Sequence, residues 1–125
     1  MCGIIGINSS KPVSSSIINS LKKLEYRGYD SAGIATIDSG YIKEVKCEGR
    51  VESLEEAVSK SKLTGNVGIG HVRWATHGIP NTINAHPHSS ENVSVVHNGI
   101  IENSTLLKKY LLKKDTNLNH KQIQR

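Results

Sequence analysis

Apolar residues recur along the chain at two spacings, one typical of strands and the other typical of helices. Short apolar runs between glycines and polar residues predict strands over residues 3–7, 34–38, 41–47, 67–74 and 93–96. Apolar residues three or four positions apart predict helices after the serines at 14–16, over 51–58 and after Asn103. Serine and asparagine are common caps at helix amino termini. The apolar stripes of these helices are Ile17, Ile18, Leu21 and Leu24; Val51, Leu54, Ala57 and Val58; and Leu106, Leu107, Tyr110 and Leu111.

Turn and loop signals separate these elements. The sequence Asp38-Ser39-Gly40 predicts a tight hairpin turn between two strands. Residues 27–33 form a polar loop bounded by glycine, and residues 76–92 form a long loop of the kind that usually carries function in a compact domain. Residues 115–125 have no clear apolar period, so no structure is predicted there. Hairpins mixed with helices favour an α+β fold over a doubly wound parallel sheet.

Composition limits the size and chemistry of the core. The 125 residues suffice for one small domain with a modest core. The chain has one Trp, four Tyr and no Phe, so the core must consist mainly of Ile, Val and Leu. Eleven glycines indicate many turns, or backbone that approaches a ligand closely.

The formal net charge of +5 is confined to one end of the chain. Residues 1–103 contain ten Lys/Arg and ten Asp/Glu, whereas the residues from 104 onward contain six Lys/Arg and one Asp. Aromatic residues are not interleaved with the basic ones, as they are in many nucleic-acid-binding surfaces. We therefore expect no nucleic-acid partner.

Cysteine content and hydropathy indicate a cytoplasmic protein that does not enter a membrane. Cys2 and Cys47 are too few for a disulfide framework. The chain has no apolar run of roughly 20 residues and no signal-peptide pattern at its start. Cys47 is interpreted as a small buried apolar residue rather than a reactive thiol.

Five of the six histidines lie between residues 71 and 97, which raises the alternative of a metal site. Zinc would need three or four convergent ligands, usually including Cys or a carboxylate, and none of the histidine spacings is a zinc pattern. We expect no metal and no other cofactor. The five histidines are His71, His77, His86, His88 and His97.

Cys2 is the first candidate for catalysis. Removal of Met1, which a small second residue generally permits, would leave the Cys2 thiol beside a free α-amine. An α-amine can accept the thiol proton near neutral pH, so a single residue would supply both nucleophile and base. The alternative is an incidental cysteine at the start of a strand.

Five sequence blocks decide between these alternatives. They span residues 1–6, 24–33, 70–78, 84–88 and 96–103. Together, and in this order, they resemble the class II glutamine amidotransferases, whose nucleophile is an amino-terminal cysteine. Tyr26 before Arg27-Gly28, Tyr29 after it, and Trp74-Ala75 are similar to the amino-sugar-forming branch of that family rather than to the branches that make phosphoribosylamine or asparagine.

The resemblance implies a fold and a set of roles. The fold is the four-layer α-β-β-α sandwich of N-terminal-nucleophile hydrolases. Cys2 would attack the side-chain amide of L-glutamine, while the Asn98 side chain and the Gly99 N–H would form the oxyanion hole. The alternative for Asn98-Gly99 is an ordinary tight turn after a strand.

The same resemblance implies the substrate-binding residues. Arg73 would bind the α-carboxylate of glutamine, for which a planar bidentate donor is well suited. Thr76 and His77 would contact glutamine or shape its pocket, and Arg27 and Gly28 would lie in a loop near the nucleophile. Trp74 would cover the site or, alternatively, belong to the core. The remaining alternative for Arg73 is a surface arginine.

The C-terminal part departs from the family pattern. The family binds the substrate α-amine with an aspartate about two dozen residues beyond the Asn-Gly pair, but Ile123 and its neighbours include no acid, and Asp115-Thr116 comes too early. We interpret residues 1–112 as the front part of the glutaminase domain, incomplete at its C-terminus, and residues 113–125 as a divergent basic tail. We therefore expect the sugar-isomerase domains of the family to be absent from this chain, and a separately encoded remainder to be a possible partner. The alternative function is a catalytically inactive remnant or a partner-dependent binding module. No oligomeric state is predicted.

Overall fold

The computed structural model of the protein describes residues 1–75, 79 and 81–114. Two short 3-10 helices, Glu25–Arg27 and Thr82–Asn84, lie between the longer elements. Those elements are, in chain order, β1 (Gly3–Asn8), α1 (Ser14–Leu24), β2 (Ser31–Asp38), β3 (Tyr41–Glu48), α2 (Val51–Ser61), β4 (Val67–Arg73), β5 (His88–Ser90), β6 (Val93–Val95) and α3 (Ser104–Lys113).

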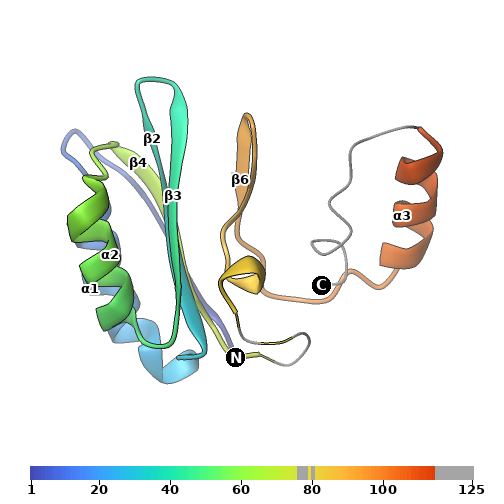
Figure 1. The fold of residues 1–125 in the computed structure, drawn as a ribbon, viewed down its shortest axis with the longest axis horizontal. Helices are drawn as coiled ribbons and strands as arrows, with labels where there is room; N and C mark the ends of the chain where they lie inside the picture. Colours follow the sequence, from blue (N-terminus) through green and yellow to red (C-terminus); the bar gives the residue numbers. More distant parts are fainter. Residues whose placement is uncertain (76–78, 80, 115–125) are drawn as a thin grey trace.

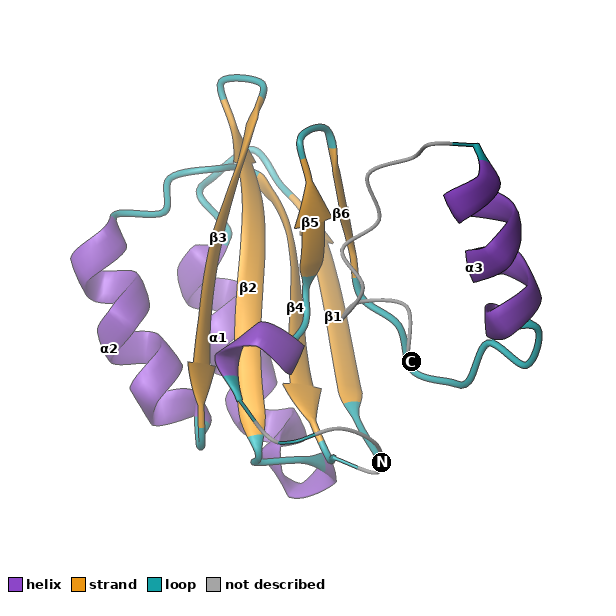
Figure 2. Ribbon diagram, turned by 45° about the vertical axis from the view of Figure 1, so that its right-hand side comes forward, coloured by secondary structure: helices purple, strands orange, loops and turns teal. Residues whose placement is uncertain are grey.

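The elements are stacked as helices, sheet, hairpin and helix. Four antiparallel strands form a sheet in the order β1-β4-β2-β3, and α1 and α2 cover one of its faces (Figures 1 and 2). The β5–β6 hairpin lies against the other face, and α3 lies beyond the hairpin (Figure 1). The α+β class is confirmed, and the order of layers is the α-β-β-α order that the family resemblance implied.

The core lies between the sheet and its two helices. Alternate residues of β4 face the helices, and two of them are glycines that allow α1 to approach closely. A Cβ on Gly70 would lie 2.6 Å from Ile17 Cγ2, and one on Gly68 would lie 2.8 Å from Ile17 Cδ1. The buried cluster consists of aliphatic side chains, as the composition predicted. Its members are Val13, Ile17, Ile18, Leu21, Ala32, Ile34, Val51, Leu54, Leu63 and Val72.

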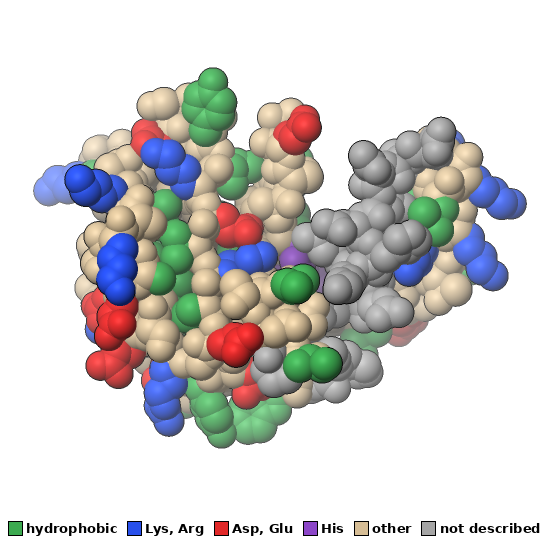
Figure 3. Space-filling model, in the orientation of Figure 1, with side chains coloured by type: hydrophobic (Ala, Val, Ile, Leu, Met, Phe, Trp, Pro, Cys, Tyr) green, Lys and Arg blue, Asp and Glu red, His purple; other side chains and the backbone are tan. Residues whose placement is uncertain are grey.

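The opposite face of the sheet receives the chain that leads into the hairpin. A Cβ on Gly33 would lie only 2.1 Å from the His86 carbonyl oxygen, so glycine is required for this segment to pack onto β2. Lys46 Nζ then donates to the Pro87 carbonyl oxygen at 3.1 Å. Figure 3 shows acidic and basic side chains next to each other between the sheet and the hairpin. Lys46 Nζ also pairs with Glu44 Oε1 at 3.1 Å.

Three expectations about local structure were wrong. The predicted loop at 76–92 contains a 3-10 helix and strand β5. The predicted buried strand at 93–96 is β6, whose Val93 and Val95 are 55% and 49% exposed. The expected side-chain caps are also missing, because α1 begins after Val13 and Ser14 Oγ instead donates to the Leu63 carbonyl oxygen at 3.1 Å. Asn103 holds the cap position of α3 without a side-chain hydrogen bond.

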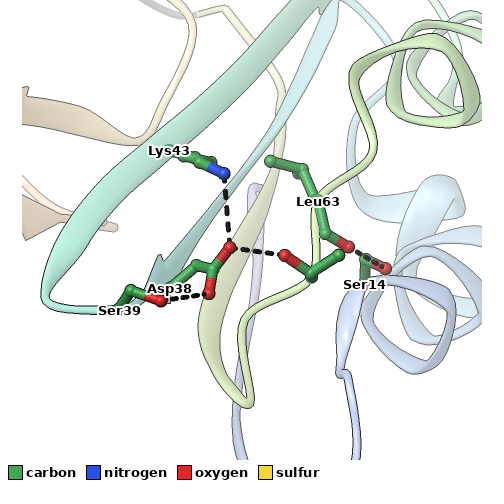
Figure 4. Close-up of polar contacts among 6 residues, drawn as sticks. Ser14, Asp38, Ser39, Lys43 and Leu63 are labelled. Atoms are coloured by element: carbon green, nitrogen blue, oxygen red, sulfur yellow. Dashed lines mark hydrogen bonds and ion pairs between the residues drawn. The ribbon is translucent and has the colours of Figure 1, made fainter.

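A polar cluster joins the β2–β3 turn to the chain before β4 (Figure 4). Asp38 accepts hydrogen bonds from Lys43 Nζ at 3.2 Å, Ser39 Oγ at 3.1 Å and Thr64 Oγ1. Ser39 and Gly40 both have positive φ, which is the conformation of the predicted tight hairpin turn. The hydrogen bonds from Thr64, Lys43 and Ser39 lower the pKa of the Asp38 carboxyl below 3.8.

None of the described helices is long and apolar enough to cross a membrane.

The core assignment predicts that Leu21→Ala lowers the free energy of unfolding by about 3 kcal/mol, because a fully buried Leu leaves a cavity. Leu106→Ala is the matched control, since Leu106 is 70% exposed and the same truncation there should change the free energy by less than about 0.5 kcal/mol. Urea unfolding followed by circular dichroism measures both. Equal effects of the two substitutions would contradict the assignment.

The Asp38 cluster predicts a pH-dependent effect of Asp38→Asn. Because the folded-state pKa of Asp38 is lowered, its carboxylate stabilises the fold at neutral pH, and this contribution is lost as the pH falls through that pKa, below 3.8. The difference in unfolding midpoint between wild type and Asp38→Asn should therefore be largest near pH 7 and shrink toward pH 3. Glu91→Gln, which changes an exposed carboxylate in the β5–β6 turn, should show no such trend. A difference for Asp38→Asn that stays constant with pH would refute the role of its charge.

Candidate active site

Cys2 is positioned by the pairing of β1 with β4. In the antiparallel register Gly3 lies opposite Val72, so the residue before β1 reaches the residues that follow β4. The Trp74 backbone N–H donates to Cys2 Sγ at 3.3 Å, and the thiol lies 3.7 Å from the Trp74 carbonyl oxygen. The side chain is half-buried. A backbone donor at the sulfur stabilises negative charge on it, as a nucleophilic thiolate requires.

Two side chains converge on the backbone carbonyl oxygen of Cys2. Arg27 Nε donates to it at 3.0 Å, and Asn98 Nδ2 donates to it at 3.1 Å. The other end of the Asn98 amide, Oδ1, lies 2.9 Å from His71 Nε2. Residues far apart in the sequence therefore meet at the start of β1.

The loop between α1 and β2 braces the segment that holds the thiol. A Cβ on Gly28 would lie 2.4 Å from the Arg73 carbonyl carbon and 2.6 Å from Trp74 N, so only glycine allows this close approach. The Asp30 N–H donates to the Arg73 carbonyl oxygen at 3.1 Å, and the Ala75 N–H donates to Asp30 Oδ2 at 2.6 Å. The peptide that donates to Cys2 is thus held from both sides.

Arg73 is the last residue of β4 and lies on the same face of the strand as His71. Arg73 is only 4% exposed. Its Nη1 donates to the Ile79 carbonyl oxygen at 3.5 Å. Burial lowers the pKa of the Arg73 guanidinium, while the neighbouring Cys2 and Asp30 groups oppose this shift. A guanidinium remains protonated even so, which leaves a fixed positive charge close to the thiol.

Trp74 is 44% exposed and therefore does not belong to the core. Its ring meets the Tyr29 ring edge-on, with centroids 5.6 Å apart. Trp74, Tyr26, Arg27 and Met1 line a small cavity of about 150 Å³. A larger apolar cavity of about 260 Å³ includes Val67 and Val93 and lies at the opposite end of β4 from Arg73, away from the thiol.

Gly99 follows Asn98 with φ at +155°, and both residues are exposed. A Cβ there would lie 3.1 Å from His97 Nε2, so glycine avoids crowding the His97 ring. Thr76 and His77, the remaining predicted substrate-binding residues, lie outside the described residues.

Enzymes that use glutamine resemble this chain over most of its length. The glutamine–fructose-6-phosphate aminotransferase of Agrobacterium fabrum is 57% identical over 111 residues, which cover 89% of this chain and 18% of that enzyme. The enzyme of the same name from Clostridium acetobutylicum is 53% identical over 116 residues, which cover 91% of this chain and 19% of the relative. The solved structure of glutamine phosphoribosylpyrophosphate amidotransferase from B. subtilis, with ADP and GMP, superposes with a TM-score of 0.74 at 28% identity. Over about nine-tenths of its length, the chain is thus similar to enzymes named as glutamine-using aminotransferases and amidotransferases.

A second solved structure, described as the allosteric regulatory enzyme of purine biosynthesis, superposes on this chain with a TM-score of 0.78 at 29% identity. Each structural match covers 95% of the chain and 26% of the solved protein. No family model matches the chain. The chain spans about a fifth of the length of the curated relatives it matches, 18% in the first of them.

The structure brings together most of the residues that the sequence assigned to the candidate site. Cys2, Arg27, Gly28, Trp74 and Asn98 are joined by direct contacts. Arg73 and Gly99 lie at the same place because each is the direct sequence neighbour of a contacting residue, Trp74 and Asn98 respectively.

Sequence reasoning missed two residues that the structure adds to the site, Asp30 and His71. Both lie within the sequence blocks that resemble the family, and His71 precedes Arg73 by two positions in a predicted strand, which puts the two residues on one face. That alternation is the signal that could have identified His71. Asp30 gave no such signal, because its partner Ala75 lies 45 residues away.

His71, His86 and His88 lie together near the site, and the described residues contain no group of side chains that could hold a metal ion. The rings of His71 and His86 are stacked with centroids 4.4 Å apart, and His86 and His88 are also 4.4 Å apart. The cluster therefore packs as rings against the sheet.

The close approach at Gly28 predicts that Gly28→Ala displaces the Arg73–Trp74 peptide. Forcing a methyl group against backbone atoms should lower the free energy of unfolding by about 1–3 kcal/mol and shift the amide resonance of Trp74. Gly6→Ala is the matched control, because a Cβ there would lie an ordinary 3.9 Å from its nearest neighbour, Ile69 Cγ2. Two-dimensional NMR and urea unfolding test both. An unchanged Trp74 amide in Gly28→Ala would show that the loop does not brace the site.

Proposed function

We propose that this chain binds L-glutamine and hydrolyses its side-chain amide, with Cys2 as the nucleophile. The observation that carries the proposal is the convergence on Cys2 of the Trp74 N–H, 3.3 Å from the sulfur, and the Asn98 amide, 3.1 Å from the carbonyl oxygen. A nucleophile, a buried cation at Arg73 and an amide donor thus meet at one end of the sheet. These are the groups that amide hydrolysis by a thiol needs.

The first step is the removal of Met1. Met1 is 80% exposed, so an aminopeptidase can reach it, and its removal frees the Cys2 α-amine. The free amine takes the thiol proton, and the resulting thiolate attacks the side-chain carbonyl carbon of glutamine. Until then the Cys2 nitrogen belongs to a peptide bond and cannot act as a base.

The attack gives a tetrahedral oxyanion bound by Asn98 Nδ2 and the Gly99 N–H. A preorganised donor of this kind is worth about 3 kcal/mol of transition-state stabilisation. The intermediate collapses when the α-ammonium group returns its proton to the leaving nitrogen, which departs as ammonia and leaves a γ-glutamyl thioester on Cys2. Water then attacks the thioester, releasing glutamate and restoring the thiol.

Recognition of glutamine is assigned to the residues around the thiol. Arg73 binds the α-carboxylate, and Trp74 covers the bound substrate. Thr76 and His77 contact the substrate or shape its pocket, while Arg27 and Gly28 maintain the loop beside the nucleophile. The names of the curated relatives contain both glutamine and fructose 6-phosphate, so we assign the released ammonia to amino-sugar synthesis. We assign no step of the sugar chemistry to the residues of this chain. We place the reaction in the cytoplasm, where a free thiol stays reduced.

A partner-dependent role is the second candidate, and the surface of α3 favours it. None of the α3 residues is buried, and apolar side chains along it and before it are exposed, such as Leu106 at 70% and Ile100 at 73%. Exposed apolar surface of this kind marks protein interaction. A separately encoded polypeptide that covers this surface would complete the domain, and in its absence the chain would be inactive.

The proposal predicts that the purified chain releases glutamate from glutamine and that Cys2→Ala abolishes this activity. Cys47→Ala is the matched control, because burial raises the pKa of the Cys47 thiol and keeps it protonated. Asn98→Ala should lower kcat by roughly 10²–10³-fold. Glutamate release by Cys2→Ala at the wild-type rate would overturn the assignment of the nucleophile. Release that appears only after addition of a partner polypeptide would support the second candidate.

A further inference from the structure

The Asn98 side chain is held at both ends of its amide. Nδ2 lies 3.1 Å from the Cys2 carbonyl oxygen, and Oδ1 lies 2.9 Å from His71 Nε2. A carbonyl oxygen can only accept a hydrogen bond, so the NH₂ group of Asn98 faces Cys2 and the amide oxygen faces His71. An amide oxygen also only accepts, so His71 Nε2 must carry a proton.

We propose that His71 is a positioning residue, whose Nε2–H fixes the Asn98 amide with its NH₂ group directed at Cys2. This inference rests on the proposed function, in which Asn98 stabilises the oxyanion. The NH₂ group has two protons, and the Cys2 carbonyl oxygen occupies one of them, which leaves the second for the substrate oxyanion.

Without the His71 donor the Asn98 amide would be held only at Nδ2, by the Cys2 carbonyl oxygen, and Oδ1 would have lost its donor. A flipped amide would place Oδ1 against the Cys2 carbonyl oxygen and would present an acceptor where negative charge develops during the reaction. Asn98 follows the short strand β6 and is exposed, so its own backbone environment does little to fix the side chain. The constraint on the Oδ1 end of the amide therefore comes from His71.

His71 is itself fixed much more firmly than Asn98. It lies near the middle of β4, paired with Ile4 on one side and Gly33 on the other, and it is only 1% exposed. The His86 ring stacks on it at 4.4 Å with an interplanar angle of 22°. The close approach of the His86 backbone to Gly33 sets this stack, so the position of the donor is determined by the sheet.

The experiment compares three substitutions of His71 in the full chain. Glutamine places a nitrogen the same number of bonds from Cβ as Nε2 and can donate to Asn98, whereas asparagine reaches only the position of Nδ1, and leucine donates nothing. His71→Asn and His71→Leu should lower kcat for glutamate release at least tenfold, within the roughly 10²–10³-fold loss expected for Asn98→Ala, with little change in KM. His71→Gln should retain most of the activity.

A double-substitution cycle separates positioning from a general structural role. In the Asn98→Ala background, His71→Asn should cause no further loss of kcat, because the group through which it acts is absent. Equal impairment by His71→Gln and His71→Asn, or a full effect of His71→Asn in the Asn98→Ala background, would overturn the inference.

A measurement that needs no turnover distinguishes failure of this inference from failure of the proposed function. Nitrogen-15 NMR of the His71 ring should show the proton on Nε2, and Asn98→Ala should shift that resonance. A proton on Nδ1 alone, or a His71 Nε2 signal unchanged by Asn98→Ala, would overturn the inference whether or not the chain hydrolyses glutamine.

Discussion

The antiparallel pairing of β1 with β4 is the constraint on which the site depends. With Gly3 opposite Val72, Cys2 lies beside the Arg73–Trp74 peptide, and the Trp74 N–H reaches the sulfur at 3.3 Å. A slip of one residue would turn every side chain of β1 to the other face and separate the thiol from its donor. The register is set by burial, because Gly3 and Ile5 must face α1 for the core to close. Formation of the core and formation of the site are therefore one event.

Glycines allow neighbouring segments to pack closely against the paired strands. Gly70 lets α1 pack onto β4, Gly33 lets the His86 segment pack onto β2, and Gly28 lets the loop after α1 reach the Arg73–Trp74 peptide. Each contact would be blocked by a single methyl group, so the frame around the thiol tolerates little change. The thiol is held by the Trp74 backbone N–H and the buried arginine by strand β4, whereas the Asn98 amide is held by the Cys2 carbonyl oxygen and the His71 ring.

Most of the frame could be predicted from the sequence, because the strands and helices that pack against each other have clear apolar periods. The failures have physical reasons. Strand β5 is three residues long and polar, so it has no apolar period, and β6 was expected to be buried although its valines are exposed on a two-stranded hairpin. The predicted serine cap of α1 was wrong because the Ser14 hydroxyl donates to the Leu63 carbonyl oxygen, 49 residues away, and no local sequence pattern encodes this contact. The site was found from motif order, whereas the roles of His71 and Asp30 depend on contacts between distant residues.

The central claim is that this chain assembles a glutamine-binding thiol site at Cys2. Intact-mass spectrometry before and after exposure to an electrophilic glutamine analogue tests it most directly. The account predicts loss of Met1 and a single adduct on Cys2 that excess glutamine prevents. An unmodified Cys2, or equal labelling of Cys2 and Cys47 that glutamine does not prevent, would contradict it.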